Sequence, residues 1–171
     1  MTQTPIDSDK NRHSGYNSAI TIAPLLYADV EIVVDMAKRM HAESPVYRDY
    51  PFSEVIMRSW VVAAIEKPNS CFCAVAWKNG EIIGAFLGLA GHMLFSECRR
   101  ADELGFYVYE QFRGGRAALL LVKAFEEWAK RVGCVLVMTG VSAGITDERA
   151  ISFYERLQYK KHGATFRREI G

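Results

Sequence analysis

The residues with the clearest chemical potential lie where a strand-like segment meets a long helix-like one. Phe106–Tyr109 is apolar and aromatic, and it leads into Arg113-Gly114-Gly115-Arg116-Ala117-Ala118. Glycines let an anion approach the backbone, and the free amides of a helix N-terminus favour negative charge beside two guanidinium groups. The junction predicts a diphosphate site, although a tight turn with solvated arginines has the same pattern. It carries neither a P-loop nor a dinucleotide fingerprint.

A second group of polar residues lies nearer the C-terminus. Asp147 precedes a helical pattern that contains Tyr154, whose phenol has an ordinary pKa of ~10 and is protonated at neutral pH. Tyr154 can therefore donate a proton, or it can be a buried helix residue with a satisfied hydroxyl. Glu103 lies at the start of a strand pattern, where a carboxylate can simply be solvated at the strand end.

The chain must fold so that these residues meet, and its periodicity predicts how. Asn79-Gly80 between two apolar runs indicates a hairpin with a type I′ turn. Helical spacing marks four segments, the second of them with Ser53 as its N-cap. The expected helices are Ala28–His41, Ser53–Lys67, Gly115–Val132 and one beginning at Asp147, and the expected strands are Ser18–Ala23, Cys71–Lys78, Glu81–Ala90, Glu103–Tyr109, Val135–Gly140 and two short ones within Tyr159–Ile170.

This order of elements favours an α+β fold. Strands joined by a hairpin pair antiparallel, whereas a strand–helix–strand unit from Glu103 to Gly140 requires a right-handed parallel crossover. We therefore expect a central mixed, mostly antiparallel sheet with helices on both faces. Trp60, Trp77 and Trp128 fall on apolar faces and are expected in the core.

Both motifs resemble those of the GNAT superfamily of N-acetyltransferases. The family loop Arg/Gln-x-x-Gly-x-Gly/Ala is similar to Arg113–Ala118, with Arg116 in place of the central glycine. The family segment Asn-x-x-Ala-x-x-Phe-Tyr-x-x-x-Gly-Phe is similar to Asp147–Tyr159, with Asp147 and Gln158 as departures. The likeness extends over about Ala19–Arg168, and the run Met40–Pro45 is similar to some phage- and prophage-associated members.

The resemblance implies a GNAT-like sheet with a splayed parallel pair and a single acetyl-CoA-binding acyltransferase domain over residues 18–171. The pantetheine arm would meet the backbone around Phe106, Tyr107 and Val108, with the Val108 amide as oxyanion donor. The resemblance also implies cofactor binding by Arg113, Gly114, Gly115, Arg116, Ala117, Ala118 and Asp147.

In this reading Tyr154 protonates the departing thiolate, and Glu103 is the base, working through water. The acceptor is a primary amine of a small molecule or a protein, with His41 and Glu43 near its site. A non-catalytic CoA-binding module of a phage-related assembly is the alternative. Relatives often dimerise, so a homodimer is a further expectation.

Composition limits the remaining possibilities. The chain of 171 residues suits one domain, and residues 1–17 are expected to form a mobile tail. A net charge of +1 argues against nucleic-acid binding, and no apolar run is long enough for a membrane span, which favours a cytoplasmic location. The spacing of the four cysteines matches no zinc template, so no metal is expected.

Overall fold

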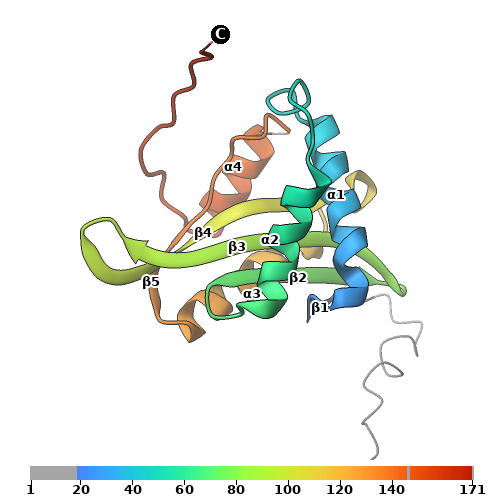
Figure 1. The fold of residues 1–171 in the computed structure, drawn as a ribbon, viewed down its shortest axis with the longest axis horizontal. Helices are drawn as coiled ribbons and strands as arrows, with labels where there is room; N and C mark the ends of the chain where they lie inside the picture. Colours follow the sequence, from blue (N-terminus) through green and yellow to red (C-terminus); the bar gives the residue numbers. More distant parts are fainter. Residues whose placement is uncertain (1–18, 146, 171) are drawn as a thin grey trace, which may run out of the picture.

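The computed structural model describes residues 19–145 and 147–170; the predicted N-terminal tail lies outside them. One central sheet has the strand order β1-β2-β3-β4-β5 (Figure 1). Neighbouring strands pair antiparallel except β4 and β5, which are parallel. The elements are β1 Thr21–Pro24, a 3₁₀ turn Tyr27–Asp29, α1 Val30–Glu43, α2 Glu54–Glu66, β2 Cys71–Lys78, β3 Glu81–Met93, β4 Ser96–Val108, a 3₁₀ turn Glu110–Phe112, α3 Arg116–Arg131, β5 Cys134–Met138 and α4 Asp147–Arg156.

The predicted α+β fold is confirmed, and its local signals explain where the elements begin and end. Asn79 and Gly80 both have positive φ, 52° and 81°, as the hairpin between β2 and β3 requires. Ser53 caps α2 by accepting a hydrogen bond from the Ile56 amide at 3.3 Å. Gly133, with φ of 80°, ends α3 in a left-handed conformation.

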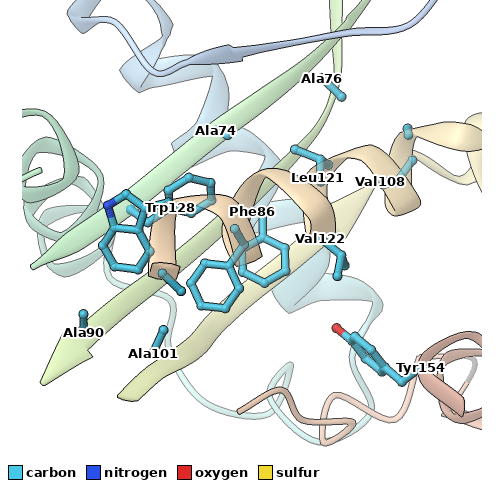
Figure 2. Close-up of a cluster of buried hydrophobic side chains, with 14 of the residues drawn as sticks. Ala74, Ala76, Phe86, Ala90, Ala101, Val108, Leu121, Val122, Trp128 and Tyr154 are labelled. Carbon is cyan, nitrogen blue, oxygen red and sulfur yellow. The ribbon is translucent and has the colours of Figure 1, made fainter. Parts of the chain in front are cut away.

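The sheet separates two hydrophobic cores. One lies against α3 and α4, and the other against α1 and α2. In the first, Phe125 of α3 packs on Phe86 of β3 with ring centroids 4.5 Å apart, and Trp128 stacks on Phe125 at 5.7 Å. Figure 2 shows Tyr154 at the margin of this core, with its hydroxyl directed away from α4. Both faces of the sheet are therefore covered, as predicted. Separately, no described helix is long and apolar enough to cross a membrane.

Strands β3 and β4 are longer than the sequence pattern suggests. The pattern predicts a connection over Gly91–Arg100, but antiparallel pairing continues through this segment as far as Met93 and Ser96. Charged residues mask the alternation there. Arg99, for example, donates to the Asn69 carbonyl at 2.7 Å and also to the Val132 carbonyl. These bonds tie the base of the long hairpin to the ends of its neighbours.

The prediction of two short strands within Tyr159–Ile170 is wrong. These residues form no strand and extend away from the sheet (Figure 1). Phe166 and Ile170 remain 92% and 95% exposed, so they gain no burial that would order a strand. The outer edge of β5 therefore has no strand beside it in the described part of the chain, and Val135 on β5 is exposed.

The tryptophans do not all lie in the core. Trp128 is buried, and its indole donates to the Pro68 carbonyl at 2.7 Å. Trp77 is half-buried and packs against the second core. The spacing predicts a core position for Trp60 too, but this residue is 41% exposed and lines a cavity beside α2. An apolar helix position can face a cavity as well as a core, and the spacing does not distinguish the two.

The contact between β3 and α3 generates a stability prediction. A β-carbon at Gly88 would lie 2.4 Å from the Phe125 ring, which is fully buried and cannot retreat. We expect Gly88→Ala to lower the free energy of unfolding by about 1–3 kcal/mol through overpacking. Gly91→Ala on the same strand is the control, because a β-carbon at Gly91 would have no atom within 4 Å. Equal urea midpoints for the two variants would contradict this account.

Candidate active site

Strand β4 parts from β5 halfway along its length. The last parallel pair joins Asp102 to Met138, where β5 ends, whereas β4 continues to Val108. The register between β3 and β4 also shifts here, because Leu87 lies opposite Gly105 and Gly88 opposite Glu103. Leu104 is thus an extra residue, a β-bulge that bends the strand. The predicted splay of the parallel pair is present, and the edge of β4 from Glu103 to Val108 has no described strand paired to it; we call the space along this unpaired edge the gap.

The register decides which backbone groups face this gap. The Tyr109 amide donates to the carbonyl of Ile83, which lies opposite it, at 3.0 Å. In an antiparallel ladder, bonded and non-bonded pairs alternate. Phe106 and Val108 therefore direct their amides and carbonyls away from β3 and toward the gap. This places two of the predicted cofactor contacts at an edge that β5 does not occupy, while Tyr107 points its backbone at β3.

Glu103 and Tyr154 meet at the entrance of the gap. The Tyr154 hydroxyl donates to Glu103 Oε2 at 2.7 Å. Glu103 also accepts a hydrogen bond from the backbone of Gly140, and the Thr139 side chain hydrogen-bonds Tyr154. Thr139 and Gly140 directly follow β5, so the pair connects both sides of the gap to α4. The two residues predicted to be catalytic are thus in direct contact.

Burial changes the acidity of both groups. It raises the pKa of Glu103 to about 7, and the hydrogen bonds from Tyr154 and Gly140 only partly oppose this rise. Burial, followed by the charge of Glu103, raises the pKa of Tyr154 above that of an ordinary phenol. Near neutral pH the carboxyl can therefore exchange a proton, whereas a tyrosinate would be unfavourable.

The loop before α3 has the features of an anion site. Gly114 has a φ of 83°, and Gly115 is the N-cap of α3 without any side-chain cap. The first amides of α3 are consequently available to a ligand. Arg116 is exposed, and a β-carbon at Gly114 would lie 3.6 Å from Arg149 Nη2. Ala117 is buried beneath the loop, and Ala118 is half-buried.

The Arg113 side chain contacts β4 and α1 and does not line the anion site. Its Nε donates to the Val108 carbonyl at 2.9 Å, and its Nη2 lies 2.6 Å from Glu43 Oε2. The guanidinium also lies over the Tyr107 ring, whose hydroxyl donates to Glu43. Burial tends to raise the pKa of Glu43, but these two donors hold it below its ordinary value. Arg113 therefore fastens the end of β4 to α1, and its side chain does not extend over the α3 N-terminus.

Asp147 is the first residue of α4 and has an incomplete set of partners. Its Oδ1 is buried, and no hydrogen bond to it is found among the described residues. A buried carboxylate oxygen without a donor is costly, so it marks a place where a ligand N–H would be stabilising. This fits the prediction that Asp147 contacts a cofactor with amide groups.

On the opposite face of β4 lies a cavity of about 320 Å³. Residues of β3 and β4, among them Gly105, Phe106 and Tyr107, form one wall, and α1, α2 and the loop between these helices supply the others. His41, expected near an acceptor, lines it, whereas Glu43 is held by Tyr107 and Arg113. The cavity thus reaches the same stretch of β4 that borders the gap.

Sequence reasoning missed two contributors. Arg149 lies beside the glycine loop from a helix distant in sequence, and an arginine on an exposed helix face gives no local signal of this. Thr139 and Gly140 follow β5 and hold the Glu103–Tyr154 pair, a role that only the tertiary fold reveals. In the described ranges no three His, Cys, Asp or Glu side chains group as metal ligands would, and a metal-free site stays a prediction.

The raised pKa of Glu103 predicts a pH dependence of stability. Between its ordinary value of 4.5 and about 7, the folded state holds a proton that the unfolded state has lost. Stability therefore falls as pH rises through this window, by up to about 3 kcal/mol for this group. Glu103→Gln, which cannot titrate, should have a flatter profile in urea unfolding between pH 4.5 and 7.5. Parallel profiles for the two proteins would show that burial does not perturb this carboxyl.

Solved structures share this architecture. A transcriptional regulator from Bacillus halodurans C-125 is 23% identical, with a TM-score of 0.69 over 89% of this chain and all of the other. AAC(6')-Iy, solved with the bisubstrate analogue CoA-S-monomethyl-acetylneamine, is 16% identical with a TM-score of 0.71 over 90% of this chain and 100% of its own. Glucosamine-6-phosphate N-acetyltransferase from Arabidopsis thaliana is 13% identical, with a TM-score of 0.68 over 90% and 99%. At these identities the likeness shows the fold.

No curated protein matches the sequence significantly. The family comparison is decisive instead, because residues 34–159, most of the folded chain, match a single family. That match includes the β4–α3 loop, the splayed strands and Tyr154. The chain belongs to the acetyltransferase (GNAT) family.

Proposed function

We propose that this protein is an acetyl-CoA-dependent N-acetyltransferase that transfers acetyl directly to a primary amine. The observation that carries the proposal is the open stretch of β4, with the Tyr154 hydroxyl held at its entrance by Glu103 at 2.7 Å. Family membership supplies the cofactor class. The architecture needs no nucleophile from the protein, and none of the described contacts activates one.

Several features fit acetyl-CoA. The outward amide and carbonyl of Phe106 would pair with the amide groups of the pantetheine arm, and Asp147 Oδ1 would accept from an N–H. The amides at the start of α3, with Arg116 and Arg149, would hold the diphosphate. Arg113 would act by fixing the end of β4 through Val108, because its guanidinium is held by Val108 and Glu43 and its amide by the Glu110 carbonyl.

The bound thioester supplies an activated acetyl group whose sulfur must leave with a proton. In the net reaction a nitrogen–carbon bond forms, a carbon–sulfur bond breaks, the amine loses a proton and the sulfur gains one. The Val108 amide would stabilise the charge that develops on the carbonyl oxygen. Holding both reactants at β4 would reduce the entropic part of the barrier.

Tyr154 would deliver the proton. Because its pKa is raised, forming a free tyrosinate is unfavourable, so the phenol needs a proton as it gives one away. Glu103, whose pKa is about 7, is partly protonated near neutral pH, and a protonated carboxyl can reverse the hydrogen bond, so that it donates to the Tyr154 oxygen and supplies that proton. Glu103 lies opposite Gly88, on the α3 and α4 face, so its contacts favour this role over that of a base acting on the amine.

The acceptors named for the similar structures cannot be assigned to this chain. Two similar structures are described as aminoglycoside acetyltransferases, at 16% and 15% identity, and another as a ribosomal-protein-alanine N-acetyltransferase, at 14%. Such different acceptors on one fold leave the choice to the local cavity. The alternative of a non-catalytic CoA-binding module gains no support from the paired Glu103 and Tyr154, and a homodimer remains a prediction.

The cofactor placement can be tested by affinity. We expect Arg116→Ala and Arg149→Ala each to weaken CoA binding in calorimetry by about three- to tenfold, because each removes a charge beside the α3 amides. Lys130→Ala, at the exposed far end of α3, removes the same charge away from the loop and should leave the affinity within about twofold. Equal losses in all three variants would reject this site for the diphosphate.

The proton donor can be tested by turnover. Tyr154→Phe should reduce acetyl transfer about ten- to a hundredfold, because it removes general acid catalysis while retaining the ring. CoA affinity should hardly change, and this measurement serves as the folding control. Glu103→Gln should keep the hydrogen bond to Tyr154 yet lose the pH dependence near 7 in the rate profile. Full activity of a folded Tyr154→Phe protein would show that water provides the proton.

A further inference from the structure

The cavity on the α1 and α2 face of β4 is lined mainly by apolar side chains. Its walls carry Met36, Met40, Phe52, Met57, Trp60 and Leu104. Among the described residues that line it, none is Asp, Glu, Lys or Arg, and His41 is the one histidine. The hydroxyl of Tyr107 is already engaged by Glu43.

From these walls we infer that the acceptor is a small monoamine with an apolar, arylalkyl body, such as a phenylethylamine. This inference rests on the proposed function, because it takes the cavity to be the place where the amine waits for the acetyl group. It names the chemistry of that amine, which neither the fold nor the family fixes.

The absence of carboxylates argues against polycationic acceptors. A polyamine or an amino sugar with several ammonium groups would have to bury charge without a partner, at a cost of several kcal/mol. A peptide is disfavoured for a related reason, because its backbone amides would need hydrogen-bond partners. In these walls His41 and Tyr47 offer few hydrogen-bonding groups, and the Tyr47 hydroxyl already lies 3.5 Å from the Ser142 hydroxyl.

The apolar walls also suit the chemistry of attack. An amine must be neutral to react, and burial in apolar surroundings lowers the pKa of an ammonium group. A cavity of this kind therefore favours the reactive form of a monoamine without a strong base. This is consistent with the position of Glu103 on the other face of β4, in contact with Tyr154.

The cavity is also preformed. The buried Ser44 donates its hydroxyl to the Ala143 carbonyl and accepts from the amides of Val46 and Tyr47, both at 3.2 Å. These bonds tie the loop after α1 to the segment after β5. At about 320 Å³ the cavity lies at the small end of the ~300–1,000 Å³ range of ligand sites, which suits one aromatic ring and a short chain.

Trp60 allows binding to be measured without any acetyl transfer. We would titrate the CoA-loaded protein with 2-phenylethylamine, spermidine, glucosamine and the tripeptide Met-Ala-Ala, following tryptophan fluorescence. Saturable change with 2-phenylethylamine, absent in Trp60→Phe and absent with the other three ligands, is the expected result. Tighter binding of spermidine, glucosamine or the tripeptide would overturn the inference.

A matched pair of substitutions on α2 locates the site. Met57→Lys places a cation in the cavity wall and should raise the Kd of 2-phenylethylamine at least about tenfold. Val55→Lys adds the same charge to the same helix at a residue that is 75% exposed and lies outside the cavity, so the Kd should stay within about twofold. Equal effects of the two variants would overturn the inference.

Failure of this inference and failure of the proposed function give different results. If spermidine or glucosamine is acetylated while 2-phenylethylamine neither binds nor reacts, the inference is overturned and the acetyltransferase stands. If 2-phenylethylamine binds with the expected response to Met57→Lys but no amine releases CoA thiol, the cavity assignment is supported and the catalytic proposal fails.

Discussion

A buried carboxylate at the point where two strands separate is the constraint on which the site depends. Glu103 lies at the first position of β4 beyond its pairing with β5, and without partners it would be strongly destabilising there. Its partners come from two places: Gly140 after β5 supplies an amide, and α4 supplies the Tyr154 hydroxyl. These hydrogen bonds hold the segment after β5 and helix α4 in place beside Glu103.

The two faces of strand β4 carry different groups. Toward α3 and α4 it presents Glu103 to the Tyr154 hydroxyl, and toward α1 and α2 it presents Gly105 and Tyr107 to an apolar cavity. The bulge at Leu104 lies between these two arrangements and changes the register by one residue. In the proposed mechanism, one strand would therefore carry the proton-transfer groups on one side and face the acceptor cavity on the other, with the backbone edge between them left for the thioester.

The sequence predicts most of the fold because its strongest signals are local. Asn79-Gly80 specifies a turn, Gly133 specifies a helix end, and the apolar stripe of α3 specifies a buried face. The two motifs also lie on neighbouring elements, because Arg149 of α4 approaches Gly114 in the loop before α3. The prediction fails for a non-local feature, the length of the β3–β4 hairpin. This length depends on strand pairing, which the charged residues of the segment do not indicate in the sequence.

Side-chain contacts within the site also lie beyond local signals. Nothing in the spacing shows that Arg113 turns to Glu43, 70 positions earlier, or that Arg149 approaches Gly114. Trp60 has the same helical phase as its buried neighbours, yet it faces a cavity. The two strands expected within Tyr159–Ile170 have β-like composition, but a strand forms only where a partner and burial repay its ordering.

The outer edge of β5 affects how copies of the protein can associate with one another. Its backbone groups lack a neighbouring strand in the part of the chain described, and exposed edges of this kind template association between molecules. Lys160 and Lys161 lie in the hollow beside Val135 and Leu136, so two ammonium groups accompany the bare edge. Repulsion between such groups on two approaching molecules weakens as salt shortens the Debye length. Added salt should accordingly weaken the protection that these two charges give to the edge.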